Sequence, residues 1–195
     1  YLYCGLSRAS SKEEIEERIK NNTITEILNK IEVKKGDVVM VKAGTIHAIG
    51  AGIFICEIQQ NSNCTYRMYD YDRRDKFGNP RELHIAKSLD VVNPVKYEKD
   101  NKCNVMLTHN EHYMSKRLVQ CKYFEVIKYE IEDEAKIPVD EASFLSVIVI
   151  DGEGTIMTDD NDKKLKFKAG ESFFINAGKR NVVVNGRSTC IITHV

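Results

Sequence analysis

The sequence predicts a mainly β protein, a sandwich or barrel in which one unit of strand, turn and strand occurs twice, with a short helical segment near its start. Short β-prone runs separated by glycine and by Asp or Asn turns fill the chain from Arg117 onward. Residues 36–47 and 170–181 share one pattern, which indicates an internal repeat. Helical spacing of apolar residues is found at about 11–31, and a further short helix is predicted at 81–92.

The composition excludes several classes of protein. Of 195 residues, 42% are hydrophobic and 30% charged, which is enough for one sizeable core or two smaller ones. The 29 basic and 29 acidic residues give no electrostatic case for nucleic acid or an anionic membrane as a partner. No run is apolar and long enough to span a bilayer, and nothing resembles a signal peptide. The six cysteines show no Cys-x-x-Cys spacing, so we expect free thiols and a cytoplasmic location.

The first helical segment has a predicted start. Ser11 is an N-cap candidate, and Glu14 follows it at the spacing of a capping box. Ile15 and Ile19 begin an apolar face that continues through 24–31. We expect two short helices that pack on a sheet and expose their acidic residues to solvent.

The repeat carries the first candidate functional residue. The apolar run 38–41 leads to Ala43-Gly44, and His47 leads out of that turn, which is typical of strand, tight turn and strand. A histidine at this position can face a metal ion or a substrate, although a satisfied core histidine is the commoner case. Asn181 stands in the equivalent position of the second copy. We therefore infer one functional copy and one structural copy.

Two further β-prone runs follow the histidine. Alternation in 53–60 places Glu57 on the face opposite to most of the apolar residues, and 65–71 alternates again. If the face that carries Glu57 lines the inside of a barrel, the Glu57 side chain points into the interior. The helix predicted at 81–92 ends before Pro94.

The stretch 95–116 is polar and unpatterned, which favours a connection between two units. His109 and His112 lie within it and are interpreted as surface residues. The remaining chain is predicted to be β throughout. Gly152-Glu153-Gly154 is interpreted as a hairpin turn, since no helix follows it as a phosphate-binding loop requires.

The β-rich chain contains one hairpin pattern twice: Gly-Asp or Gly-Glu, an apolar run, and then Ala-Gly. In one copy a histidine follows. This pattern resembles the cupin jelly roll. The resemblance is more specific between Val33 and Asp90. The sequences AGTIHAIG at 43–50, EIQQNSN at 57–63 and TYR at 65–67 are similar to those of bacterial type I mannose-6-phosphate isomerases. The second half of the chain is only generically cupin-like.

This resemblance implies a two-cupin architecture with an incomplete first jelly roll. Residues 1–94 would form the later part of the first, catalytic jelly roll, with the helical segment at about 11–31. Residues 95–116 would connect it to a second, degenerate jelly roll at 117–195. Because the chain opens on Tyr1 without an initiator methionine and as a strand already under way, we expect a fragment.

The resemblance also implies a zinc ion. In this family the ion is held by a Gln-x-His pair, a Glu and a later His in the Ala-Gly-x-x-His hairpin, which makes His47 the last of four ligands. No Gln-x-His pair occurs upstream of it here. A lone imidazole does not hold zinc. The resemblance thus implies that the parent protein is an enzyme. It also implies that the portion present here, when isolated, lacks the metal and the activity. The choice of zinc comes from the family, since His, Gln and Glu ligands suit several divalent ions.

The implied reaction interconverts mannose 6-phosphate and fructose 6-phosphate through an enediol. It requires proton transfer between two sugar carbons and cations for the oxyanion and the phosphate. Arg67 matches the family position that stabilises the enediolate or places the substrate, and Glu57 matches a residue for proton transfer or hydroxyl positioning. Arg73 is a candidate for phosphate contact, whereas His84 is interpreted as a packing residue on the predicted helix.

Other interpretations of the same residues stay open. Glu57 and Arg67 also suit an ion pair on a sheet surface, and Arg73 a solvated loop. A competing function is a non-catalytic cupin module that binds a sugar or sugar phosphate, or packs against another chain. Unpaired strand edges in a truncated jelly roll favour association with a second copy, so we expect a homo-oligomer.

Overall fold

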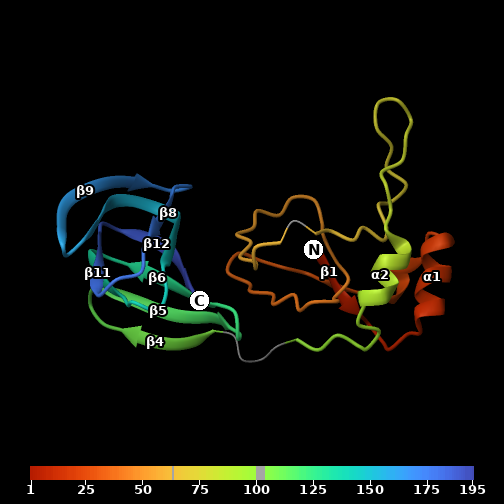
Figure 1. Ribbon diagram of the computed structural model, residues 1–195, viewed down its shortest axis with the longest axis horizontal. Helices are drawn as coiled ribbons and strands as arrows, with labels where there is room; N and C mark the ends of the chain where they lie inside the picture. The colour runs from red at the N-terminus through yellow and green to blue at the C-terminus, as the bar shows by residue number, and fades with distance from the viewer. Residues whose placement is uncertain (63, 100–103) are drawn as a thin grey trace. The chain divides into compact units, whose positions relative to one another are not determined.

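The computed structural model describes residues 1–62, 64–99 and 104–195 (Figure 1). The chain forms two compact units, Tyr1–Asp100 and Asn101–Val195. The fold is mainly β, which confirms the predicted fold class. Within the described ranges, no helix is long and apolar enough to cross a membrane.

The first unit combines a small antiparallel sheet, in the strand order β2-β1-β3, with short helices. Its elements are β1 (Leu2–Leu6), α1 (Lys12–Lys20), the 3-10 helix η1 (Ile24–Ile27), β2 (Leu28–Ile31), β3 (His47–Ile49) and α2 (Ile85–Val91). Its core is made by apolar side chains from the strands and helices, namely Leu6, Ile15, Ile19, Ile24, Ile27, Leu28 and Val92. The helices therefore pack on the sheet, as the sequence predicts.

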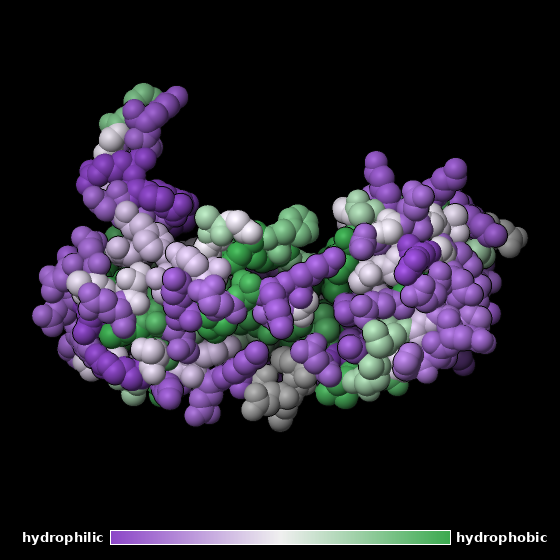
Figure 2. Space-filling model, turned by 180° about the vertical axis from the view of Figure 1, so that it is seen from behind, coloured by the Kyte–Doolittle hydropathy of each residue, from purple (hydrophilic) through white to green (hydrophobic). Residues whose placement is uncertain are grey.

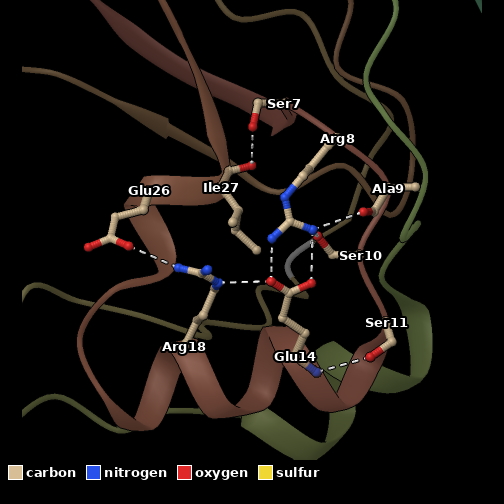
Figure 3. Close-up of polar contacts among 9 residues, drawn as sticks. All are labelled: Ser7, Arg8, Ala9, Ser10, Ser11, Glu14, Arg18, Glu26 and Ile27. Carbon is tan, nitrogen blue, oxygen red and sulfur yellow. Dashed lines mark hydrogen bonds and ion pairs between the residues drawn. The ribbon is translucent and has the colours of Figure 1, made fainter.

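Helix α1 begins at the predicted cap, which fixes the chain leaving β1 (Figure 3). The Ser11 side chain accepts a hydrogen bond from the Glu14 backbone N–H at 3.1 Å. The Glu14 carboxylate accepts from both Arg8 and Arg18, the latter through Nε at 3.0 Å. These two guanidinium groups, Arg8 first, lower the pKa of Glu14 to about 2. Arg18 also reaches Glu26 at 3.0 Å, so one ionic network ties α1 to η1.

The sequence prediction is wrong for several segments of the first unit. Residues 24–31 form η1 and then β2 rather than a second α-helix, because Leu28 and Ile31 pair with β1 in the sheet. The runs 53–60 and 65–71, expected to be strands, are not assigned to any strand in the part of the chain that the structure describes. A strand needs a neighbour for its backbone N–H and C=O groups. Phe54, in the first of these runs, is 96% exposed.

The second unit is one curled antiparallel sheet with the strand order β4-β5-β6-β12-β8-β11-β7 (Figure 1). Strands β9 and β10 both pair with β8, beside this path. The bounds are β4 (Val105–His109), β5 (Tyr113–Gln120), β6 (Glu125–Ile131), β7 (Glu134–Val139), β8 (Leu145–Thr158), β9 (Asn161–Lys168), β10 (Ser172–Ile175), β11 (Arg180–Asn185) and β12 (Ser188–His194). Alternate residues of the central strands form the core, among them Tyr129, Val147, Val149, Val182, Val184, Cys190 and Ile192.

Strand β8 joins the two halves of this curled sheet and bends at a glycine. Its first half pairs with β12 and β10, and its second half with β11 and β9. Gly152 sits at the bend with φ +85°, and a Cβ there would lie 2.1 Å from the Arg187 carbonyl oxygen. The expected hairpin turn at 152–154 is therefore wrong, because these glycines allow one continuous strand to change partners.

Strand structure also extends into the stretch 95–116 that the sequence assigned to a connection. Strand β4 and the first residues of β5 lie within it. Strand β4 is at the edge of the sheet, where most of its side chains are exposed. An exposed edge strand needs no apolar alternation, so periodicity did not reveal it.

One exposed ion pair is expected to make the stability of the second unit depend on pH. His112 Nδ1 lies 3.0 Å from both carboxylate oxygens of Asp133. This hydrogen bond raises the pKa of His112, and the same bond lowers the pKa of Asp133. The His112 contribution is therefore complete below the unfolded pKa of about 6.5 and is lost as pH rises through the higher folded value. The Asp133 contribution is complete above about pH 4 and is lost as pH falls through the lower folded value.

We expect the thermal midpoint of the native chain to fall, relative to that of His112→Gln, as pH rises from about 6 to about 9. Calorimetry across this range, with His109→Gln as the control, measures the difference. His109 is exposed on β4 and makes no ion pair with any residue that the structure describes. If the difference in thermal midpoint between the native chain and His112→Gln stays constant across the range, the His112–Asp133 pair makes no pH-dependent contribution to stability.

Candidate active site

His47 is the first residue of β3, where it directly follows a tight turn. Thr45 N–H donates to the Lys42 carbonyl at 3.1 Å, and Gly44 in this turn has φ +78°. Gly5 N–H donates to the Ile46 carbonyl at 2.7 Å, which fastens the turn to β1. The predicted turn and the strand after it are therefore present, whereas the run 38–41 before it is not assigned as a strand.

The imidazole of His47 is exposed and oriented by the backbone. Its Nδ1 lies 3.0 Å from the Thr45 carbonyl oxygen. A carbonyl oxygen only accepts, so in this bond Nδ1 carries the proton, and in the neutral ring Nε2 keeps its lone pair. This is the arrangement by which a backbone carbonyl orients a metal-binding histidine.

Glu57 lies in the irregular run 53–60 and is exposed. Its carboxylate makes no hydrogen bond or ion pair with any residue in the described ranges. The surface ion pair with Arg67 that was kept as an alternative is therefore not formed. The carboxylate is available to a ligand.

Arg67 is half-buried and tied to the residues just before α2. Its backbone N–H donates to His84 Nδ1 at 3.2 Å, and its carbonyl accepts from the His84 N–H at 2.6 Å. Its guanidinium Nη1 donates to the Glu82 carbonyl at 3.3 Å. The bonds to His84 fix the backbone of Arg67, and the Glu82 carbonyl gives its guanidinium one hydrogen-bond partner. His84, interpreted from the sequence as a packing residue, is thus the N-cap residue of α2 and a hydrogen-bond partner of Arg67.

Arg73 lies next to a buried acid that the sequence analysis missed. Asp70 is 7% exposed, and its Oδ1 accepts a hydrogen bond from Arg73 Nη2. Arg81 Nη1 lies 3.7 Å from the same oxygen. The pKa of Asp70 is lowered, first by the hydrogen bond from Arg73 and then by the charges of Arg73, Arg81 and Arg67, which outweigh the opposing effect of burial. The structure therefore places two guanidinium groups, those of Arg73 and Arg81, beside one carboxylate.

The predicted site residues are not all joined to one another. No hydrogen bond or ion pair among the residues described links His47, Glu57 and Arg67. A cavity of about 460 Å³ opens beside the His47 turn, and Lys42, Thr45 and Lys96 contribute to its lining. None of the four predicted site residues lines it. The roles assigned to these four residues remain predictions.

The described residues alone do not fit a zinc ion. No group of three or more His, Cys, Asp or Glu side chains that could hold a metal occurs among them. His47 offers a single nitrogen, whereas protein zinc sites use three or four protein ligands. The five cysteines in the described ranges are free thiols.

Comparison with known proteins identifies the class of protein to which this chain is similar. Residues 114–195 match the family described as mannose-6-phosphate isomerase, cupin domain, so the curled sheet of the second unit is a cupin jelly roll. The chain is 35% identical to mannose-6-phosphate isomerase ManA of Bacillus subtilis over 187 residues, which is 96% of this chain and 58% of that protein. It is 40% identical to mannose-6-phosphate isomerase of Streptococcus mutans over 76% of this chain and 46% of that one.

The structural comparison agrees with the sequence comparison. The crystal structure of mannose 6-phosphate isomerase from Bacillus subtilis superimposes with a TM-score of 0.88 at 34% identity, over 100% of this chain and 60% of the other. The chain therefore belongs to the mannose-6-phosphate isomerase family of cupin proteins. It spans about 58% of the length of the Bacillus relative.

Proposed function

We propose that this chain carries part of the active site of a zinc-dependent mannose-6-phosphate isomerase, which converts mannose 6-phosphate to fructose 6-phosphate through an enediol. The supporting observation is similarity in both sequence and fold to the Bacillus subtilis enzyme along the whole chain, at 34% identity and a TM-score of 0.88. The substrate is accordingly a phosphorylated hexose. We place the enzyme in the cytoplasm, where free thiols such as those described here persist.

The proposed proton transfer uses Glu57. In the direction of fructose 6-phosphate, a base removes the proton from C2 of the sugar, and a proton returns to C1 of the enediol. A carboxylate with no hydrogen-bond or ion-pair partner among the described residues, such as that of Glu57, can accept and return that proton or position a hydroxyl group. The Arg67 guanidinium, held by the Glu82 carbonyl, would stabilise the negative charge of the enediolate.

A zinc ion would be held by His47 through Nε2, because Nδ1 is occupied by the Thr45 carbonyl. The remaining ligands would come from residues that precede this chain in a longer protein. The ion would supply Lewis-acid polarisation of the sugar oxygens.

The test compares this chain with an extended protein, defined as the chain preceded by the region of the Bacillus subtilis relative that it does not match. We expect the extended protein to form fructose 6-phosphate from mannose 6-phosphate and the chain alone to form none. If the extended protein binds mannose 6-phosphate without turning it over, the chain is a sugar-phosphate-binding cupin module instead. If it does neither, both functions are excluded.

A further inference from the structure

We propose that His84 is a positioning residue for Arg67, and that it acts only while its imidazole ring is uncharged. Protonation of this one ring would then release the guanidinium group that the reaction needs. The contact between the two residues rests on the observed hydrogen bonds alone. That the contact serves catalysis rests on the role of Arg67 in the function proposed above.

Two hydrogen bonds join the backbone of Arg67 to His84. The Arg67 carbonyl accepts from the His84 N–H at 2.6 Å, and the Arg67 N–H donates to Nδ1 of the His84 ring at 3.2 Å. In an antiparallel ladder the second bond would go to the partner's backbone carbonyl. The His84 carbonyl instead accepts from the Ser88 N–H at 2.8 Å, because His84 is the N-cap residue of α2. The imidazole therefore acts as the acceptor in place of the backbone.

The bond to the ring forms in one protonation state only. An N–H group only donates, so Nδ1 accepts and carries no proton, and the proton of the neutral ring is on Nε2. When the ring takes up a second proton, Nδ1 becomes a donor as well. Two donors then face each other, and the N–H of Arg67 loses this acceptor. Protonation thus abolishes the bond to the ring.

The groups beside the ring allow it to turn away when it is charged. Glu82 Oε2 lies 3.8 Å from Nε2 of His84, and the Tyr66 and His84 rings are 6.3 Å apart between centroids. Arg67 is the cation of the facing segment. The Glu82 side chain is 82% exposed, so water screens its attraction for a charged ring. A protonated ring can therefore turn toward Glu82 and solvent.

The two His84 bonds also close the base of a long hairpin. The chain between Arg67 and His84 contains the hairpin that extends from the first unit, with Arg74 and Pro80 paired in its stem (Figure 1). The surface of this hairpin is mostly hydrophilic (Figure 2). Apolar packing therefore does little to hold it, and its base depends on polar contacts such as the His84 bonds.

The guanidinium of Arg67 depends on the same segment. In the described part of the chain, the hydrogen bonds of Arg67 go to residues 82–84, including the bond from Nη1 to the Glu82 carbonyl at 3.3 Å. Loss of the backbone bonds to His84 would therefore move the guanidinium relative to this carbonyl. A misplacement of about 1 Å in an active site can lower a rate by about 100-fold. The protonation state of His84 thus controls the proposed oxyanion donor.

The first experiment measures kcat of the extended protein and of its His84→Asn variant as a function of pH. Asparagine does not titrate, whereas the native ring does, so we expect the ratio of native to variant kcat to fall about tenfold or more from about pH 8 to about pH 5. Groups that titrate elsewhere in the site affect both proteins alike and cancel in the ratio. A ratio that is constant across this range would show that the proposal is wrong.

A second variant tests whether the acceptor itself matters. The amide oxygen of asparagine can take the place of Nδ1, whereas His84→Ala supplies no acceptor. At about pH 8 we expect kcat of His84→Ala to be roughly tenfold below that of the native protein. His109→Asn is the matched control, because His109 is exposed on β4 of the second unit, and its kcat should follow the native profile. A folded His84→Ala variant with native kcat would overturn the positioning role.

NMR of this chain separates the contact from the proposed function. We expect the backbone amide and guanidinium signals of Arg67 to move between about pH 5 and pH 8 in the native chain and to stay constant in His84→Asn. If only the amide signal moves, His84 does not position the guanidinium. An active extended protein with a constant kcat ratio refutes the positioning role and leaves the isomerase intact. An inactive extended protein refutes the isomerase, while the Arg67 signals still decide the contact.

Discussion

Replacing Arg67 with glutamine in the extended protein is expected to lower kcat for mannose-6-phosphate isomerisation by about 10²- to 10³-fold, the effect of losing one donor to a developing oxyanion. Arg67 is half-buried, its guanidinium donates to the Glu82 carbonyl, and its backbone is fixed by His84. The guanidinium therefore needs little reorganisation as charge develops on the substrate. Glutamine keeps a donor but loses the charge.

Steady-state kinetics check this expectation, with Arg187→Gln as the control. Arg187 lies in the second unit, is largely exposed and pairs with Glu132 at 3.3 Å. Its replacement should leave kcat unchanged. If Arg67→Gln loses no more activity than Arg187→Gln, Arg67 does not act on the transition state.

The second large effect concerns the core of the second unit. Ile192→Ala is expected to lower the free energy of unfolding by about 2–5 kcal/mol, the range found when a buried large aliphatic side chain is truncated. Ile192 is 1% exposed and lies on β12, a central strand paired on both sides by β6 and β8. A central strand has no free edge toward which the neighbouring side chains could relax to fill the cavity.

Urea unfolding measures this loss, and Ile150→Ala is a matched control. Ile150 lies on β8 in the same sheet but is 40% exposed. Its truncation should cost less than about 1 kcal/mol, because little of the side chain leaves an apolar environment. Equal losses in the two variants would contradict the assigned core.

The elements that the sequence predicted well are those with local chemical signals. Ser11 and Glu14 marked the start of α1, and the glycine before His47 marked its turn. The helix before Pro94 was also expected, although it begins only at Ile85. These signals depend on a few neighbouring residues, so one sequence suffices to recognise them.

The elements that the sequence predicted wrongly depend on pairing with strands far along the chain. Residues 53–60 alternate like a strand, but pairing is decided by whether another strand lies alongside. Gly152 and Gly154 have the composition of a turn, yet β8 continues through them because β9 and β11 pair with its second half. No local pattern distinguishes a turn from such a bend.

For the candidate site, the sequence suggested residues but not their contacts. His47 and Arg67 were selected from the repeat and the family resemblance, and their roles stay predictions. Asp70 was missed because it lies in a run that alternates in sequence but forms no strand, and both Met68 and Tyr69 of this run pack against the core. Its contacts with Arg73 and Arg81 are seen only in the structure.

The most direct test of the proposed isomerase is the zinc content of the purified extended protein and of its His47→Ala variant, measured by atomic emission after dialysis. We predict about one zinc per chain in the extended protein, and loss of both zinc and isomerisation in the variant. His109→Ala, in the second unit, should keep both. An extended protein that isomerises without zinc, or a His47→Ala variant that keeps full zinc and activity, would contradict the assignment of His47 as a ligand in a zinc-dependent isomerase.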